Sequence, residues 1–114
     1  MQLKIFLDNL QTSPESIEFQ DTMAFIESMY KYFPTKFKNG NLVNQAGENE
    51  GSCKIFAFAK LNKLNEENTL ACFGAYYRVD VLQNPDAENH QNIRNFMNTG
   101  WTGIEFDREA LIIK

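Results

Sequence analysis

Two side chains in this sequence are candidates for covalent chemistry, Cys53 and His90. Cys53 follows a polar, glycine-rich run at residues 47–52, at the expected first turn of a helix. The helix dipole there lowers the pKa of a thiol and favours the nucleophilic thiolate. His90 is the only histidine in the sequence, so any imidazole base must be this one. The pair is typical of a cysteine-dependent hydrolase or transferase with Cys53 as nucleophile and His90 as base.

Both residues also have a structural interpretation. Free cysteine is often a small buried hydrophobe, and a histidine at the start of a helix often bonds the adjacent turn. Cys72 lies within an apolar run and is expected to serve packing alone. The catalytic interpretation needs the Cys53 thiol and the His90 imidazole within reach of each other, and spacing along the chain does not give that distance.

A second kind of chemistry is indicated by the polar turn at residues 44–54. Backbone N–H groups at a helix N-terminus bind anions such as phosphate or carboxylate. The turn lacks the GKS or GKT ending of a P-loop, and a purely structural turn would also use asparagine and glycine. The residues that we expect to bind a ligand are Asn44, Asn49, Gly51, Ser52 and Lys54 from the turn, with Gln91, Asn92, Arg94 and Trp101 from later in the chain.

Composition limits the classes of partner. The net charge of −4 argues against a nonspecific nucleic-acid binder and against binding to an anionic membrane, because both need a basic surface. No apolar run is long enough to cross a bilayer, and the first residues lack the pattern of a secretory signal. We therefore expect a soluble, cytoplasmic protein with no nucleic acid and no membrane among its partners.

Length and cysteine usage indicate a simple organisation. The 114 residues are the length of one domain, so a single domain over residues 1–114 is predicted, with ten phenylalanines to fill its core. The two cysteines form neither a disulfide framework nor a zinc pattern. No carboxylate pair has the spacing of a metal site, so we expect no metal and no cofactor.

The candidate residues are positioned by a central helix. Residues 55–59 are apolar on every side, which is typical of a buried helix. Ser52 is the predicted N-cap, because its hydroxyl accepts a bond from an unpaired helix N–H. We expect the start of this helix to be exposed to solvent at the glycine-rich turn, beside His90.

Amphipathic helices are predicted on both sides of the central helix in sequence. Three segments have an apolar stripe typical of a helix. The first, residues 3–10, and the third, residues 70–77, have the spacing i, i+3, i+4 and i+7, and the second comprises Phe25, Ile26, Met29 and Phe33. Asp21 is the predicted N-cap of the second, which Pro34 would end, and Asn65 is the predicted N-cap of the third. Gly74, inside the third apolar stripe, indicates that another backbone segment packs closely there.

A last helix is predicted after a turn at residues 84–86. Asn89 is its expected N-cap, Ile93, Phe96 and Met97 would face the core, and Gly100 would follow its last turn.

Short extended segments complete the prediction. Asn39-Gly40 is a strong signal for a two-residue hairpin turn, which would pair Phe37 with Leu42. Residues 103–106 and 110–113 have the alternation or β-branched content of strands. The fold class predicted is α+β, a mainly helical single domain with a small antiparallel sheet.

A set of short runs spread over nearly the whole chain carries a family resemblance. The runs are 21–23, 34–35, 37, 39–40, 44, 46–47, 49, 51–56, 69–74, 76–78, 90–96 and 100–101, of which 51–56 and 90–96 are the most specific. In these runs the chain resembles the HopJ type III effector family, which is named for a protein that a plant pathogen delivers into its host and which also occurs in bacteria that are not plant pathogens. The resemblance implies a bacterial protein, either a virulence protein exported through a type III system or a housekeeping protein that stays in the bacterial cytoplasm, and it implies no defined catalytic residue.

Three hypotheses follow. The first is a binding protein for a protein partner or a small anionic ligand, at the turn of residues 44–54 with His90, Gln91 and Arg94 beside it. The second is the Cys53–His90 enzyme. The third is a translocated effector with a host protein as its target.

Overall fold

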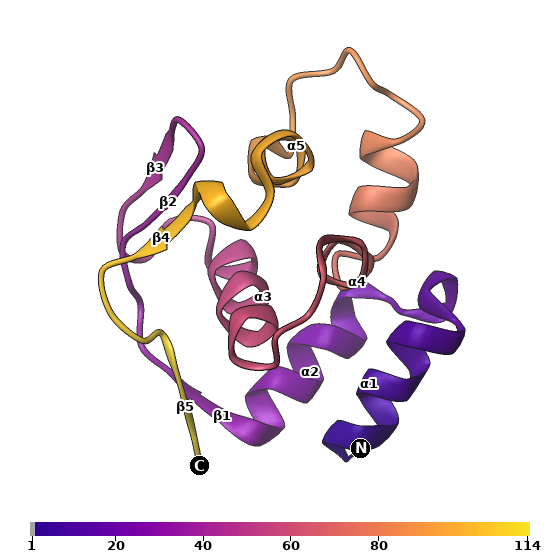
Figure 1. Cartoon of the computed structure of the whole chain (residues 1–114), viewed down its shortest axis with the longest axis vertical. Helices are drawn as coiled ribbons and strands as arrows, with labels where there is room; N and C mark the ends of the chain where they lie inside the picture. The colour runs from indigo at the N-terminus through magenta and orange to yellow at the C-terminus, as the bar shows by residue number, and fades with distance from the viewer. Residues whose placement is uncertain (1) are drawn as a thin grey trace.

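The computed structural model describes residues 2–114 and places helices around α3, with short strands along one side (Figure 1). This is the predicted α+β fold. The helices are α1 (Leu3–Thr12), α2 (Phe19–Met29), α3 (Glu50–Leu61), α4 (Glu66–Ala71) and α5 (Gln91–Thr99). The shorter or irregular helical turns are η1 (Pro14–Ser16), η2 (Tyr76–Val81, a π-helix) and η3 (Gly100–Gly103). The strands are β1 (Tyr30–Tyr32), β2 (Phe37–Asn39), β3 (Leu42–Asn44), β4 (Ile104–Phe106) and β5 (Leu111–Ile113).

Helix α3 forms the centre of the core, as its sequence predicts. Phe58 lies edge-on to three aromatic rings, those of Phe6, Phe25 and Tyr30. On another side, Phe56 packs against the rings of Phe37, Phe73 and Phe96. The buried residues of α3 are Cys53, Ile55, Phe56, Ala57, Phe58 and Ala59. Helix α3 therefore joins aromatic side chains of α1, α2, β1, β2 and α5 into a single cluster.

The start of α3 differs from the prediction. Its N-cap is Asn49, which adopts a left-handed backbone with φ of 49°, and Ser52 lies inside the first turn. Asparagine tolerates this conformation better than most residues. The Asn49 side chain does not cap the helix.

The predicted limits of α2 are wrong at both ends. Glu18 is the N-cap. Asp21 is the third residue of the helix and completes a capping box, in which its carboxylate accepts the Glu18 backbone N–H at 3.3 Å. The helix ends at Met29, and Phe33 is outside it and exposed. The helical spacing of residues 25–33 is overridden because β1 pairs with β5.

The hairpin exists, but its register differs from the predicted Phe37–Leu42 pair. Phe37 pairs with Asn44, and residues 40–41 make the turn. Asn39 is held in β2 because its side chain is fully buried and donates to a backbone carbonyl of α5 at 2.7 Å. A buried polar group that finds a partner outweighs the local turn preference.

The strands form two short antiparallel sheets, in the orders β1–β5 and β3–β2–β4. Residues 30–39 run against residues 104–113, and the pairing is interrupted between the two sheets. In the interruption, the N–H of Phe33 donates to the carbonyl of Ala110 at 2.7 Å. The two predicted C-terminal strands are confirmed, and they close the side of the molecule along α3 (Figure 1).

Helix α4 begins as predicted, with the Asn65 side chain accepting the N–H of Asn68 at 2.7 Å. It ends at Ala71, well short of Tyr77. Gly74 explains the ending: its φ is +61°, and an added Cβ would lie 2.6 Å from the backbone nitrogen of Phe19. The predicted close approach of another backbone at Gly74 is therefore confirmed.

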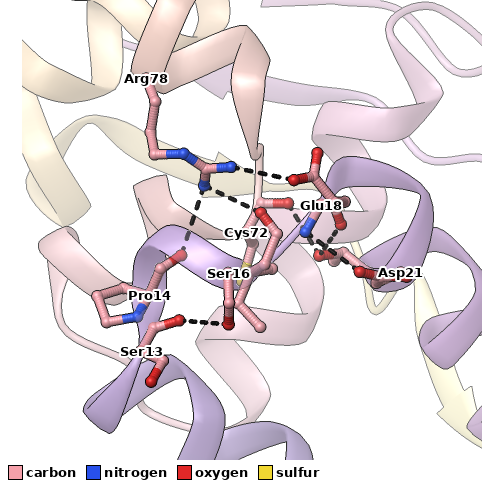
Figure 2. Close-up of polar contacts among 9 residues, drawn as sticks. Ser13, Pro14, Ser16, Glu18, Asp21, Cys72 and Arg78 are labelled. Carbon is pink, nitrogen blue, oxygen red and sulfur yellow. Dashed lines mark hydrogen bonds and ion pairs between the residues drawn. The ribbon is translucent and has the colours of Figure 1, made fainter.

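Arg78 also holds the segment around Gly74 against the start of α2. Figure 2 shows its guanidinium reaching Pro14 and Glu18. It also donates to the carbonyl of Ile17 at 2.9 Å, and Thr22 donates to the carbonyl of Cys72 at 2.9 Å. These bonds connect the start of α2 to the segment that leads into η2.

Helix α5 begins one residue later than predicted. Its N-cap is His90, with φ of 54°, and not Asn89. Ile93 and Phe96 are buried as expected, but Met97 is 43% exposed, so its predicted core position is wrong. Gly100 follows the helix with φ of 60°, as predicted.

Across residues 2–114, no helix is both long enough and apolar enough to span a bilayer.

Candidate functional site

The N-terminal ends of α3 and α5 line one pocket, which we call the two-helix pocket. Its volume is about 380 Å³, within the range of roughly 300–1,000 Å³ that is usual for small-molecule sites. The lining residues are Phe19, Leu42, Asn49, Gly51, Ser52, Phe73, Tyr76, His90, Gln91, Asn92 and Ile93.

Both helices begin in the same unusual way. Each follows a residue with a left-handed backbone, Asn49 for α3 and His90 for α5, and neither N-cap side chain bonds to its helix. The first backbone N–H groups of a helix have no partner inside it. Each helix start also carries a partial positive charge of roughly half an elementary charge. The two helix starts therefore bring two sets of N–H donors and two partial positive charges to the pocket.

A network of four asparagines, of which Asn39, Asn44 and Asn92 are buried and Asn49 is exposed, holds the two helix starts together. The Asn92 amide nitrogen donates to the Asn44 side-chain oxygen at 3.0 Å, and the Asn44 amide returns a bond to the Asn92 oxygen at 3.2 Å. Asn49 donates to the same Asn44 oxygen at 2.7 Å. Asn39 donates to the Asn92 oxygen at 3.0 Å. Asn44, 1% exposed, thus lies behind the pocket as a support.

His90 is oriented by two residues of η2. Its Nε2 lies 3.0 Å from Oδ2 of Asp80, and its ring packs against the Tyr76 ring with centroids 5.0 Å apart. Because residues four apart lie on one side of a helical turn, η2 presents both side chains to the imidazole. No cluster of three or more histidine, cysteine, aspartate or glutamate residues suits a metal within residues 2–114.

Cys53 faces away from this arrangement. It is 1% exposed, and its thiol donates to the carbonyl of Thr35 at 3.7 Å. Burial raises the pKa of Cys53, and burial likewise raises the pKa of the neighbouring Tyr32. No hydrogen bond joins Cys53 to His90 in the described chain. The enzyme hypothesis gains no support from this geometry and stays a prediction.

Cys72 is fully buried, in keeping with its expected role in packing. Burial raises its pKa to about 12, so the thiol is protonated at neutral pH.

Four of the predicted ligand-binding residues do not line the two-helix pocket: Asn44, which lies behind it, and Lys54, Arg94 and Trp101. The Lys54 ammonium lies 4.8 Å from the centre of the Tyr32 ring. Arg94 donates to backbone carbonyls of the loop before α5. Trp101 donates its indole N–H to the carbonyl of Leu64 at 3.0 Å. These side chains serve the fold, and the pocket contains no lysine or arginine among its described lining residues.

The remaining predicted residues do converge. Asn49, Gly51, Ser52, His90, Gln91 and Asn92 all line the pocket. Their function as ligands stays a prediction.

Sequence reasoning missed other parts of the site. Phe19 and Phe73 form apolar wall, and Asp80 orients the imidazole. The glycine at position 51 was a usable sequence signal that another group packs closely there. In the structure that group is the Phe19 ring, which would lie 2.8 Å from a Cβ at Gly51. Nothing in the spacing of Asp80 and His90 marked them as a pair.

Comparison with known proteins gives one family and one structure. The family model described as HopJ type III effector protein matches residues 3–111. A crystal structure described as "unknown function protein VPA0580" is 60% identical, with a TM-score of 0.98, and the match covers 100% of this chain and 95% of that one. No curated protein matches the chain.

Proposed function

The chain belongs to the HopJ type III effector protein family, and from this premise we propose that it acts by binding a small anionic ligand in the two-helix pocket. The observation that supports this proposal is the meeting of two uncapped helix starts in one pocket. Each supplies backbone N–H donors and a partial positive charge, and a helix N-terminus is a ready site for a carboxylate or phosphate.

The walls of the pocket narrow the class of ligand. Phe19, Phe73 and Tyr76 give it an apolar side, and the Phe19 and Tyr76 rings pack edge-on with centroids 5.0 Å apart. Since neither lysine nor arginine is among the described lining residues, a group with a single negative charge suits the pocket better than a polyphosphate. We therefore propose a monoanion with an apolar or aromatic body, such as an aryl carboxylate.

The oriented imidazole gives the pocket a further polar group. Because Asp80 bonds to Nε2, Nδ1 is the nitrogen left to face a ligand. Since the Asp80 carboxylate accepts the Nε2 hydrogen, Nδ1 accepts a hydrogen bond in the neutral ring and donates one to an anion when the ring is protonated. His90 is thus proposed to fix the orientation of the ligand, with Ser52 as a second side-chain donor at the start of α3.

An NMR titration tests the proposal. Phenylacetate is added to isotope-labelled protein, with phenylacetamide as the neutral analogue and inorganic phosphate as a bare anion. We expect saturable shifts of the Gly51, Ser52, Gln91 and Asn92 amides with phenylacetate and much weaker shifts with the amide. Equal binding of the neutral analogue, or shifts that avoid both helix starts, would contradict the proposal.

A pair of variants at one position sharpens the test. Ser52→Asp adds a negative charge in the first turn of α3, where an acidic residue favours the helix but repels a bound anion. Ser52→Asn is the neutral control of nearly the same shape. We expect affinity for phenylacetate to fall roughly tenfold or more in the Asp variant and to change less than about threefold in the Asn variant. A partner protein that presents a carboxylate to the pocket would shift the amides of the two helix starts and would compete with phenylacetate for binding.

A second proposal concerns delivery, and the family description supports it. We propose that the protein is exported through a type III secretion apparatus into a host cell. A translocation reporter fused to the C-terminus of the whole chain tests this in bacteria with and without a working apparatus. Reporter signal in host cells that depends on the apparatus is expected, and equal signal from both strains would refute export by this route.

A further inference from the structure

A second cleft lies on another part of the molecule, between α3 and the chain that links β4 to β5. Its volume is about 420 Å³, and it shares no lining residue with the two-helix pocket. The interruption between the two sheets creates it, because residues 107–110 leave the regular strand pairing beside α3. The lining residues are Ala57, Lys60, Leu61, Phe106, Arg108, Glu109, Ala110 and Leu111.

The inner surface of this cleft is apolar. Ala57 and Ala110, which are 7% and 2% exposed, face the space with small side chains. Phe106 and Leu111 form further apolar wall, and Leu61, 47% exposed, lies toward solvent. An apolar concavity of this size binds the hydrocarbon part of a ligand, because contact removes apolar surface from water.

Two cations flank the apolar surface. The Lys60 ammonium lies 5.9 Å from the centre of the Phe106 ring, and Arg108 lines the same cleft. Neither forms an ion pair within the described chain, where the ion pairs are Arg78–Glu18 and His90–Asp80. Glu109 is the single acid among the lining residues, so the lining with its two cations carries one net positive charge, although the protein as a whole carries −4.

We propose that this cleft binds a free medium-chain monocarboxylate. Its hydrocarbon chain would lie against Ala57, Phe106 and Leu111, and its two carboxylate oxygens would meet Lys60 and Arg108. The charge complementarity selects a carboxylate over a neutral lipid, since a guanidinium and an ammonium match two anionic oxygens. The volume, near the lower end of ligand pockets, selects a small molecule over a peptide helix.

Titration of the full chain with octanoate tests the site by NMR. Octanol carries the same chain without the charge, and acetate carries the charge without the chain. We expect saturable shifts of the Lys60, Phe106 and Arg108 amides with octanoate, binding of octanol weaker by roughly fivefold or more, and none with acetate.

Charge variants with a matched control decide the role of the cations. Lys60→Gln combined with Arg108→Gln is expected to weaken octanoate binding roughly tenfold. Lys4→Gln, at an exposed position of α1 outside the cleft, should leave it unchanged. Ala57→Leu should block binding by filling the space, and the charge variants decide the question if that variant does not fold.

Three results would overturn the proposal: octanol binding as tightly as octanoate, unchanged affinity in the double variant, or shifts outside the cleft. Octanoate shifts confined to Gly51, Ser52 and Gln91 would support the two-helix pocket and reject this cleft. Phenylacetate bound at the two-helix pocket with no octanoate effect at Lys60 would likewise separate the two proposals.

Discussion

At the scale of single residues, Asn92 has the largest predicted effect on the candidate site. Its side chain bonds Asn39 and Asn44, both of which are buried. Asn92→Ala removes these partners and leaves buried amide groups underpaired, which should lower the free energy of unfolding by roughly 2 kcal/mol. Urea unfolding measures the loss, and we expect phenylacetate binding to weaken with it, because the two helix starts lose their connection.

Asn98→Ala is the control for that substitution. Asn98 belongs to the same helix and is exposed, so its replacement should change stability by no more than about 0.5 kcal/mol. Similar losses in the two variants would mean that helix composition, and not the asparagine network, determines the result.

Cys72 is expected to make the free energy of unfolding depend on pH in the alkaline range. Burial raises its pKa from 9.0 to about 12. Above pH 9 the unfolded chain releases the thiol proton, whereas the folded chain keeps it. The free energy of unfolding should therefore be unaffected by Cys72 below pH 9 and should fall between pH 9 and about 12, by at most about 1.4 kcal/mol per pH unit.

Unfolding of the natural chain and of Cys72→Ala, measured under reducing conditions from neutral to alkaline pH, isolates this contribution. The variant is less stable at neutral pH because a cavity forms, but its stability should decline less steeply above pH 9. Parallel pH curves would show that the buried thiol is not the titrating group.

At the scale of elements, the crossing of the α2 start over the segment before η2 depends on Gly74. In Gly74→Ala, the new Cβ would lie 2.6 Å from the Phe19 nitrogen, at a φ of +61°. A backbone atom cannot move aside as a side chain does, so we expect a loss of roughly 3 kcal/mol or more. Thermal and urea unfolding of the variant measure it.

Gly47→Ala separates the two causes of that loss. Gly47 also has a positive φ, +90°, but a Cβ there meets no described atom within 4 Å. Only the backbone strain remains, and it should cost about 1–2 kcal/mol. If both alanine variants lose the same stability, the close approach at Gly74 contributes nothing.

Elements with a strong local pattern could be predicted from the sequence. Residues 55–59 of α3 are apolar on all sides and buried, and Asn65 caps α4, because both signals are local. The limits of α2 could not be predicted, since the strand pairing that ends it at Met29 comes from the far end of the chain. The register of the hairpin likewise depends on where Asn39 finds a partner in the folded core.

The candidate site was predictable to a similar extent. The turn before α3 and the run around His90 were singled out because polar, helix-starting segments have a recognisable composition. That they share one pocket follows from the asparagine network, which joins residues 48 positions apart. The left-handed N-caps at Asn49 and His90 carry no sequence signature beyond the tolerance of asparagine for that conformation.

At the scale of the whole molecule, the last strand of the chain closes the core. β5 pairs with β1 across about 80 positions of sequence, and the Lys114 backbone N–H donates to the carbonyl of Met29 at 3.0 Å. Contacts of such sequence separation cost loop-closure entropy, so we expect this pairing to form late in folding. Burial of the Leu111 side chain, which is 2% exposed, offsets this entropy loss. Ile113, in contrast, is 66% exposed.

Leu111→Ala should therefore lower the free energy of unfolding by about 2–5 kcal/mol, the range for a truncated core leucine. Ile113→Ala, on the same face of the same strand, should change it by no more than about 0.5 kcal/mol. Because the contact forms late, the loss should appear mainly as faster unfolding and not as slower folding. Stopped-flow kinetics in urea measures both rates. Equal losses in the two variants would mean that β5 stabilises the molecule through its backbone pairing alone, and slower folding of Leu111→Ala would place the C-terminal strand in the folding nucleus.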